Sequence, residues 1–171
     1  LMKISEQYQQ PVKMRLCDTL GFGVPWPGVA VPRSVPKLVH GLRKIGVKPE
    51  LLEWHGHNDF HKVLVDASTA WLYGCSAANA AIFGCGERTG NPPLEALVVE
   101  HAQLKGMTAG VNYAAITELA DYARKELGLE ILGEVVACEP AAGSPKYMAC
   151  VPAQAIDRLM VKNGISLDAI D

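Results

Sequence analysis

The segment Glu53-Trp54-His55-Gly56-His57-Asn58-Asp59-Phe60 is the most informative part of this sequence, because it has two histidines at the end of an apolar run. That run begins at Leu51-Leu52 and predicts a strand over residues 51–55. In an extended strand, residues i and i+2 point to the same face, so His55 and His57 can converge on one metal ion. Neutral imidazole is a common metal ligand, and oxygen ligands often complete such a site. The candidate oxygen ligands are Glu53, Asp59 and Asn91.

Two further segments accompany the histidines. Cys17-Asp18-Thr19-Leu20-Gly21-Phe22-Gly23 precedes them, and Gly84-Cys85-Gly86-Glu87-Arg88-Thr89-Gly90-Asn91 follows them. Together the three segments resemble the C-terminal motifs of the Claisen-condensing, metal-dependent TIM-barrel family, in its order and at its spacing. This family comprises the isopropylmalate, homocitrate and Re-type citrate synthases, with the hydroxymethylglutaryl-CoA lyases as relatives. The resemblance runs from about residue 14 to about residue 131, and the sequence from Trp54 to Lys62 is most similar to the homocitrate and Re-citrate synthase branch.

The resemblance implies a divalent metal, and Mn²⁺, Mg²⁺, Zn²⁺ and Fe²⁺ all suit two imidazoles with oxygen ligands. It makes His55 and His57 metal ligands, and it matches Asn91 to an asparagine that completes or borders the metal shell. The remaining protein ligand should be an aspartate of the family's N-terminal strand, whose Arg-Asp or Arg-Glu motif has no counterpart in this sequence. Two polar residues hydrogen-bonded to their neighbours at a strand end are the competing interpretation of the histidines.

The resemblance also implies the reaction, a Claisen condensation of acetyl-CoA with a 2-oxo acid, followed by hydrolysis of the thioester. Glu53 points to the same face as His55, so it could act in catalysis, orient a ligand or contact the substrate. A structural carboxylate behind the ligands is the alternative role for Glu53. Thr19 matches the family's threonine that hydrogen-bonds the carboxylate of the 2-oxo acid, with a turn-capping hydroxyl as the alternative.

Other polar residues of these segments are expected to play structural parts. Asp18 should hold its own loop, and Glu87 should form an ion pair with Arg88. His61 and Lys62 are expected to be solvated residues in the first turn of a helix.

The composition of the 171 residues indicates an ordinary globular protein, with 49% hydrophobic and 20% charged residues and a net charge of −2. The sequence has no block of basic residues, which excludes nucleic acid and anionic membrane surfaces as expected partners. It also has no signal-peptide pattern and no apolar run long enough to span a membrane. The five cysteines lack C-x-x-C spacing, which suits reduced thiols in a cytoplasmic protein.

Strand-like and helix-like segments alternate along the chain. The sequence predicts strands over residues 14–17, 51–55 and 78–83, and helices over residues 36–45, 62–73 and 92–104. The unbroken apolar character of residues 78–83 predicts a strand buried on both faces. Such alternation predicts parallel β-α units, and all three segments fall where the strands end.

We therefore predict an α/β fold, namely the C-terminal strands and helices of a (β/α)8 TIM barrel with a short helical tail. Residues 1–110 would form the barrel part of the catalytic domain. Residues 111–171 would form a helical linker and tail, with helices over 113–127 and 152–162, that diverges from the family after about residue 131. A barrel of this type needs roughly 250 residues, so the chain is expected to be a fragment or one subunit of a split enzyme.

The leading functional interpretation is part of an acyltransferase of the homocitrate or Re-citrate synthase type. Its expected partners are acetyl-CoA, a 2-oxo acid, the missing N-terminal half of the barrel and, as the family implies, a second copy in a homodimer. An isopropylmalate synthase or a metal-dependent lyase on the same scaffold is the alternative enzyme. A non-catalytic half-barrel subunit whose unpaired strand edge docks a partner is the alternative of a different class.

Overall fold

The computed structural model describes residues 1–106, 110–130, 137–144 and 149–169. Contacts between residues divide the chain into two units, Leu1–Ile116 and Thr117–Asp171. The boundary that the sequence predicts, between residues 110 and 111, stays a prediction.

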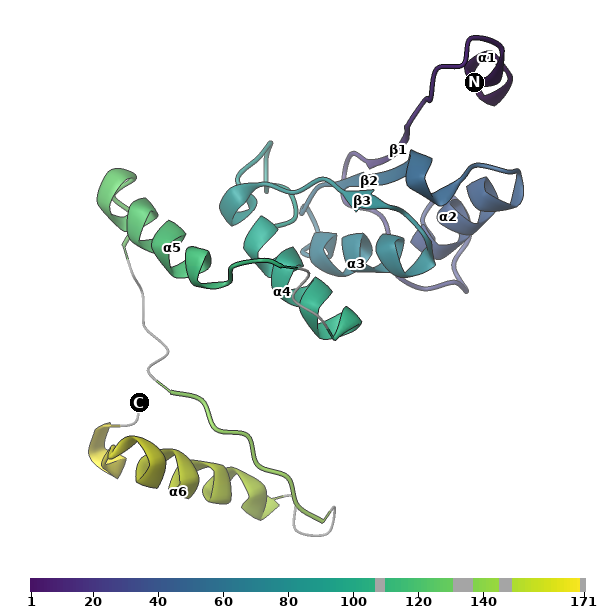
Figure 1. The fold of residues 1–171 in the computed structure, drawn as a ribbon. Coiled ribbons are helices and arrows are strands. Elements are labelled where there is room, and N and C mark those ends of the chain that lie inside the picture. Colours follow the sequence, from purple (N-terminus) through teal and green to yellow (C-terminus); the bar gives the residue numbers. More distant parts are fainter. Residues whose placement is uncertain (107–109, 131–136, 145–148, 170–171) are drawn as a thin grey trace. The chain divides into compact units, whose positions relative to one another are not determined.

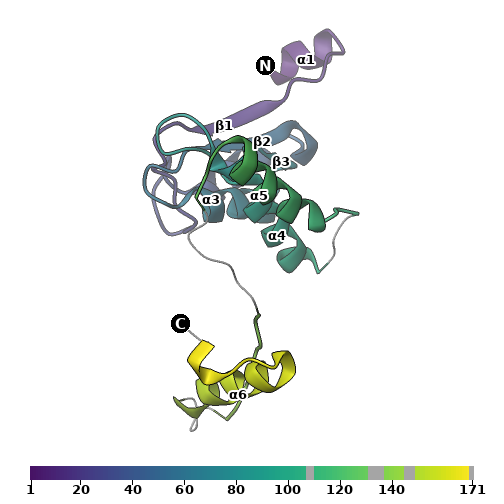
Figure 2. The ribbon, with the colours of Figure 1, turned by 90° about the vertical axis from the view of Figure 1, so that its left-hand side faces the viewer.

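The first unit is built on a parallel sheet. Its strands are β1 (Met14–Asp18), β2 (Leu52–Gly56) and β3 (Ala77–Ala78), and they lie in the order β1-β2-β3. Both neighbouring pairs run parallel, as the predicted alternation of strands and helices requires. The loops that follow the strands gather at one end of the sheet (Figure 2).

Four helices accompany this sheet: α1 (Met2–Gln7), α2 (Val35–Lys44), α3 (Val63–Tyr73) and α4 (Leu94–Lys105). α3 lies beneath the strands, with α2 on one side of it and α4 on the other (Figure 1). The order β1-α2-β2-α3-β3-α4 is therefore three consecutive β-α units, which confirms the predicted parallel α/β arrangement.

The start of α2 shows how local sequence fixes an element. Ser34 is the N-cap, and its hydroxyl accepts a hydrogen bond from the backbone N–H of Lys37 at 3.3 Å. The same hydroxyl donates to the backbone oxygen of Trp26 at 2.8 Å, so it also holds the proline-rich loop before the helix. Pro36 lies in the first turn, where the absence of its N–H costs nothing.

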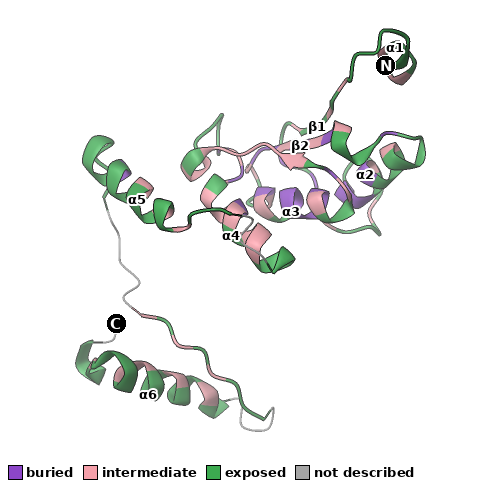
Figure 3. Ribbon diagram, in the orientation of Figure 1, coloured by how far each residue is buried: buried purple, intermediate pink, exposed green. Residues whose placement is uncertain are grey.

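The core lies between β2 and the helices. Leu52 and Trp54 are at most 1% exposed, and α3, which packs against β2, α2 and α4, buries residues 66–70 in succession (Figure 3). Because side chains alternate along a strand, Glu53 and His55 point to the opposite face of the sheet. The buried residues that pack with Leu52 and Trp54 are Val35, Val39, Val47, Ala67, Ala70, Cys75 and Leu97.

The strand predicted over residues 78–83 is wrong for most of its length. β3 ends at Ala78, and a single parallel bridge then joins Ala81 to Pro93. Residues Ile82–Gly84 form a 3₁₀ helix, in which Phe83 has a φ of +55°. Alanine has low strand propensity, and residues 77–81 are only half-buried at the edge of the sheet, so the run lacks the packing that stabilises a strand buried on both faces.

The second unit contains the C-terminal helices. α5 (Ala114–Glu126) begins in the first unit, and α6 (Val151–Asn163) ends at Gly164 with a φ of +63°. Both helices were predicted from the sequence to within a few residues. The predicted divergence begins at residues 131–136, which lie outside the described residues. No described helix is both long and apolar enough to cross a membrane.

Candidate metal and substrate site

The two histidines stand at the end of β2, at the centre of the sheet. His55 is the fourth residue of the strand, and the backbone N–H of His57 donates to the oxygen of Asp18 at 3.2 Å, which continues the pairing with β1 beyond the strand. The imidazole centroids lie 5.1 Å apart, with an angle of 81° between the rings. The predicted convergence of His55 and His57 is therefore present in the structure.

The two imidazoles fit a shared metal ion. The Nδ1 atoms of His55 and His57 are both buried, and neither has a hydrogen-bond partner among the described residues. When two imidazoles bind the same metal ion, with nitrogen–metal distances of about 2.1 Å, their ring centres lie roughly 5 Å apart. This agrees with the observed separation of the ring centroids. Unpartnered buried nitrogens are costly unless something occupies them, and a cation would do so.

The ligand set in this chain is incomplete. Within the described residues, no group of three or more histidine, cysteine, aspartate or glutamate side chains is placed to hold a metal ion. A metal at His55 and His57 would therefore take its remaining ligands from an amide, a substrate or residues beyond those described.

Asn91 lies beside the same strand end. Its side-chain Nδ2 donates to the backbone oxygen of Gly56 at 2.8 Å, and the oxygen of Gly90 accepts from the N–H of Asn58 at 3.0 Å. Because Nδ2 is used in this bond, Oδ1 is the atom left to act as a ligand. A Cβ at Gly86 would collide with that oxygen, so a larger residue there would displace the side chain of Asn91. The assignment of Asn91 as a metal ligand stays a proposal.

Glu53 has a partner that the sequence did not reveal. The guanidinium of Arg15 lies 3.0 Å from Oε1 of Glu53, and the Glu53 side chain is 12% exposed. The register of the sheet explains this ion pair, because Arg15 stands opposite Glu53 on the neighbouring strand. Alternation along residues 14–18 would have placed Arg15 on this face, but only the register shows which residue it meets.

Burial and neighbouring charge favour the neutral form of His55. Burial lowers the pKa of His55, and the nearby imidazole of His57 and then the guanidinium of Arg15 lower it further. Neutral imidazole is the form that binds metal ions. Cys17 stands opposite His55 in the register and is exposed.

Asp18 holds the loop after β1, as predicted. Its carboxylate accepts hydrogen bonds from the N–H groups of Phe22 at 2.9 Å and Gly23 at 2.8 Å. Thr19 follows directly and is exposed at the end of the strand. It lines a cavity of about 380 Å³ together with Asp18 and Trp54. Thr19 is therefore accessible in the loop after β1, but the residues that line this cavity do not include His55 or His57.

Lys62 differs from its prediction as a solvated residue. It is half-buried, and its Nζ donates to the backbone oxygens of Gly21 at 2.8 Å and Gly23 at 2.7 Å. The lysine thus ties the start of α3 to the loop after β1. The sequence missed this contact because the two segments are distant along the chain.

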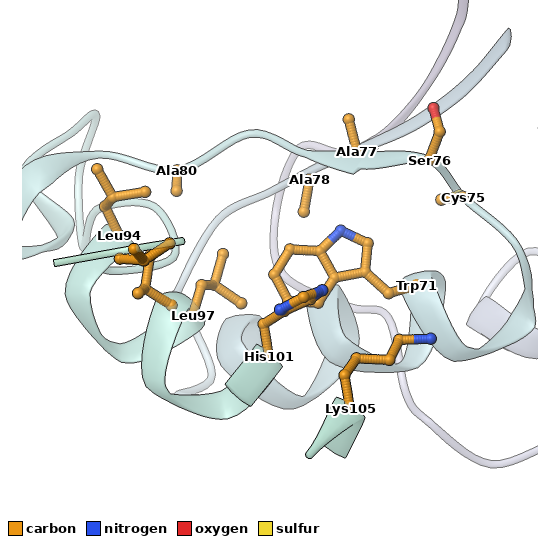
Figure 4. Close-up of a pocket in the computed structure, with 12 residues that line it drawn as sticks. Trp71, Cys75, Ser76, Ala77, Ala78, Ala80, Leu94, Leu97, His101 and Lys105 are labelled. Atoms are coloured by element: carbon orange, nitrogen blue, oxygen red, sulfur yellow. The ribbon is translucent and has the colours of Figure 1, made fainter. Parts of the chain in front are cut away.

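A larger cavity lies away from the histidines. It has a volume of about 520 Å³ and lies between β3, α3 and α4, where His101 packs edge-on against Trp71 at 5.7 Å between ring centroids (Figure 4). Its lining is mostly apolar, with Lys105 among its residues. The cavity adjoins the free edge of β3 and does not contain His55 or His57.

Known proteins are similar to this chain in sequence, and solved structures are similar to it in fold. The sequence profile of the HMGL-like family matches residues 4–122. A citrate (Re)-synthase of Syntrophus aciditrophicus is 52% identical over 132 residues, which make up 77% of this chain and 21% of that protein. A citrate (Re)-synthase of Clostridium kluyveri is 56% identical over 128 residues, which make up 74% of this chain and 28% of that protein. The chain thus spans roughly a quarter of the length of these relatives.

Solved structures support the same fold. An HMG-CoA lyase of Acinetobacter baumannii, solved with coenzyme A and 3-methylmalate, has a TM-score of 0.58 and 23% identity over 82% of this chain and 48% of that chain. The parallel strands and covering helices are therefore part of a TIM barrel, as predicted from the sequence. Since the family profile covers most of the chain and the relatives share over half of its matched residues, this chain belongs to the HMGL-like family.

Proposed function

We propose that this chain forms the metal-binding part of a citrate synthase of the Re type, which condenses acetyl-CoA with a 2-oxo dicarboxylic acid. The observation that carries the proposal is the pair of histidines at the end of β2, with ring centroids 5.1 Å apart and both Nδ1 atoms buried without a partner. The 52% and 56% identity to citrate (Re)-synthases favours this substrate class over that of isopropylmalate synthases or lyases.

In this proposal His55 and His57 hold a divalent metal, and Asn91 completes or borders the shell from the loop after β3. When bound, the cation supplies Lewis acidity that polarises the ketone of the 2-oxo acid. Thr19 donates a hydrogen bond from its hydroxyl to the substrate carboxylate. Glu53, held by Arg15 at 3.0 Å, faces the same side and contacts substrate or orients His55.

The proposal requires further parts of the barrel. Additional metal ligands and the contacts to acetyl-CoA would come from an N-terminal half, and the whole enzyme would be a homodimer in the cytoplasm. Five cysteines in the thiol form are compatible with that compartment.

A second candidate is a non-catalytic subunit that docks a partner through the edge of its sheet. The observation that favours it is the free edge of β3 beside the apolar cavity of about 520 Å³. In that case the histidines would be retained without a metal.

The two candidates are separated by titrating Mn²⁺ and a 2-oxo dicarboxylic acid into the chain, alone and with the N-terminal part of the barrel. Binding is followed by the electron paramagnetic resonance signal of free Mn²⁺, and turnover by the release of thiol from acetyl-CoA. The proposed function predicts turnover in the mixture only. Turnover by this chain alone, or no metal binding in either sample, would contradict it.

Replacement of one ligand sharpens this experiment. His55→Ala should weaken Mn²⁺ binding in the mixture by more than roughly a hundredfold, since loss of a hydrogen-bonding partner behind a ligand already costs 10- to 100-fold. His40→Ala is the matched control, because His40 is exposed on α2. If the two variants bind Mn²⁺ with equal affinity, His55 has a structural role and is not a metal ligand.

A further inference from the structure

Arg88 makes an unusual set of contacts in the loop after β3. Its backbone has a φ of +56°, which a non-glycine residue adopts rarely. Its Nε lies 2.9 Å from Oδ1 of Asp59 and its Nη2 lies 3.1 Å from Oδ2, so the guanidinium grips the carboxylate with two parallel hydrogen bonds. The predicted ion pair with Glu87 is present as well, but longer, at 3.5 Å.

The same guanidinium reaches a third loop. Its Nη2 also donates to the backbone oxygen of Thr19. Thr19 follows β1, Asp59 follows β2 and Arg88 follows β3, so one side chain joins the loops at the ends of all three strands.

The other hydrogen bonds between these loops join neighbours only. The N–H of His57 donates to Asp18, which links the first loop to the second, and the N–H of Asn58 donates to Gly90, which links the second to the third. Within residues 1–106, Arg88 provides the hydrogen bond that spans from the third loop to the first.

From these contacts we infer that Arg88 is a positioning residue, which fixes the distance between Thr19 and the histidine pair and thereby sets the affinity for the 2-oxo acid. The inference rests on the proposed function, since it assumes that Thr19 binds the substrate carboxylate. A substrate held by both Thr19 and the metal needs both at once in the correct place, and a misplacement of about 1 Å can cost on the order of a hundredfold. Among the described residues, the side chain of Arg88 forms its hydrogen bonds and ion pairs with Thr19, Asp59 and Glu87, and none with His55 or His57.

The test compares Arg88→Ala and Arg88→Lys with a matched control, Arg43→Ala, in the mixture with the N-terminal part of the barrel. Arg43 is likewise exposed and donates to a backbone oxygen, that of Tyr73, at 3.0 Å. Arg88→Ala should raise the KM for the 2-oxo acid at least tenfold, while the KM for acetyl-CoA and the Kd of Mn²⁺ change less than twofold. Arg88→Lys keeps the charge but loses the two-pronged grip, so it should restore only part of the affinity.

Two outcomes of that experiment would overturn the inference. The KM for the 2-oxo acid could be the same in Arg88→Ala as in Arg43→Ala. Alternatively, both KM values and the Kd of Mn²⁺ could worsen together, as in a general loss of structure.

A readout without activity separates this inference from the proposed function. The amide of Leu20 shares a peptide group with the oxygen of Thr19, so its NMR chemical shift in this chain reports the hydrogen bond from Arg88. The shift should change in Arg88→Ala and stay unchanged in Arg43→Ala. An unchanged Leu20 shift in Arg88→Ala would overturn the inference even if the enzyme is active. A changed shift with no turnover in any sample would instead count against the proposed function alone.

Discussion

At the scale of single residues, Asp66 stands out as a buried carboxylate without hydrogen-bond partners among the described residues. It lies on α3, is 1% exposed, and neither carboxylate oxygen has a hydrogen-bond partner among the described residues. Burial is the main reason why the pKa of Asp66 is raised to about 6. The positive charge of Lys62 lowers this pKa somewhat, and the negative charge of Asp18 raises it further. A buried carboxylate without partners is stable only as the neutral acid, so its charged form must destabilise the fold.

This predicts the effect of pH on stability. The folded-state pKa of about 6 lies above the ordinary value of 3.8, so folding binds a proton between these values. The free energy of unfolding should therefore fall as pH rises from about 4 to about 6, by on the order of 2–3 kcal/mol from this group, and stay lower above that window. Asp66→Asn removes the charge, so it should be more stable than the unmodified chain at pH 8 by about 1–3 kcal/mol and no more stable at pH 4.

Urea unfolding at pH 4, 5, 6, 7 and 8 measures this difference. Asp121→Asn is the control, because the side chain of Asp121 is 54% exposed and its charge is already solvated. A gain from Asp66→Asn that is the same at every pH, or no gain at all, would contradict the prediction.

The burial of Asp66 is also a feature that could not be predicted from the sequence. The helical period correctly places Val63, Ala67 and Ala70 toward the core, and Asp66 falls on the same face. Aspartate is almost never fully buried, so composition alone argues for the surface. Likewise, Glu53 could be assigned to the open face of its strand, whereas its contact with Arg15 depends on the register of the sheet.

At the scale of helices and strands, the predictions from sequence were correct where the signals for an element lie close together in the chain. The sequence signals of α2 are local, because its N-cap Ser34, its Pro36 and its apolar period lie within the helix or directly before it. The failed strand over residues 78–83 had only an apolar run, and its state depends on what packs and pairs beside it. Lys62 was misjudged for the same reason, since its partners are backbone oxygens of residues 21 and 23, in the loop after β1.

The cap of α2 gives a test at this scale. Ser34→Ala should lower the free energy of unfolding by about 1–2 kcal/mol, because it removes the cap and one of the two hydrogen bonds that the oxygen of Trp26 accepts. Ser76→Ala is the control: its hydroxyl also donates to backbone oxygens, but Ser76 is exposed, so the loss should stay within about 0.5 kcal/mol. Equal losses in urea unfolding would mean that the cap adds nothing to α2.

At the scale of the whole molecule, this chain is one part of a barrel, and β1 and β3 are the edge strands of its sheet. The sheet ends at β3, and the cavity of about 520 Å³ beside that edge is mostly apolar. Unpaired edges and apolar hollows favour association with another segment. A strand and helix from the N-terminal part of the barrel would cover both features, and a charged group placed in the cavity should prevent this.

Leu94→Glu is the substitution that tests this arrangement. Leu94 lines the cavity from α4 and is 44% exposed, so the change should cost the isolated chain little stability. Binding of the N-terminal part should weaken at least tenfold, since a charge without a partner would have to be buried at the interface. Leu72→Glu is the matched control on α3, where the residue is 57% exposed and does not line the cavity.

Calorimetric titration of the N-terminal part into each variant measures the affinity. If Leu94→Glu binds as tightly as Leu72→Glu, the cavity is not the contact surface. If both variants lose binding, α3 also contributes, and the edge of β3 is not the sole point of contact.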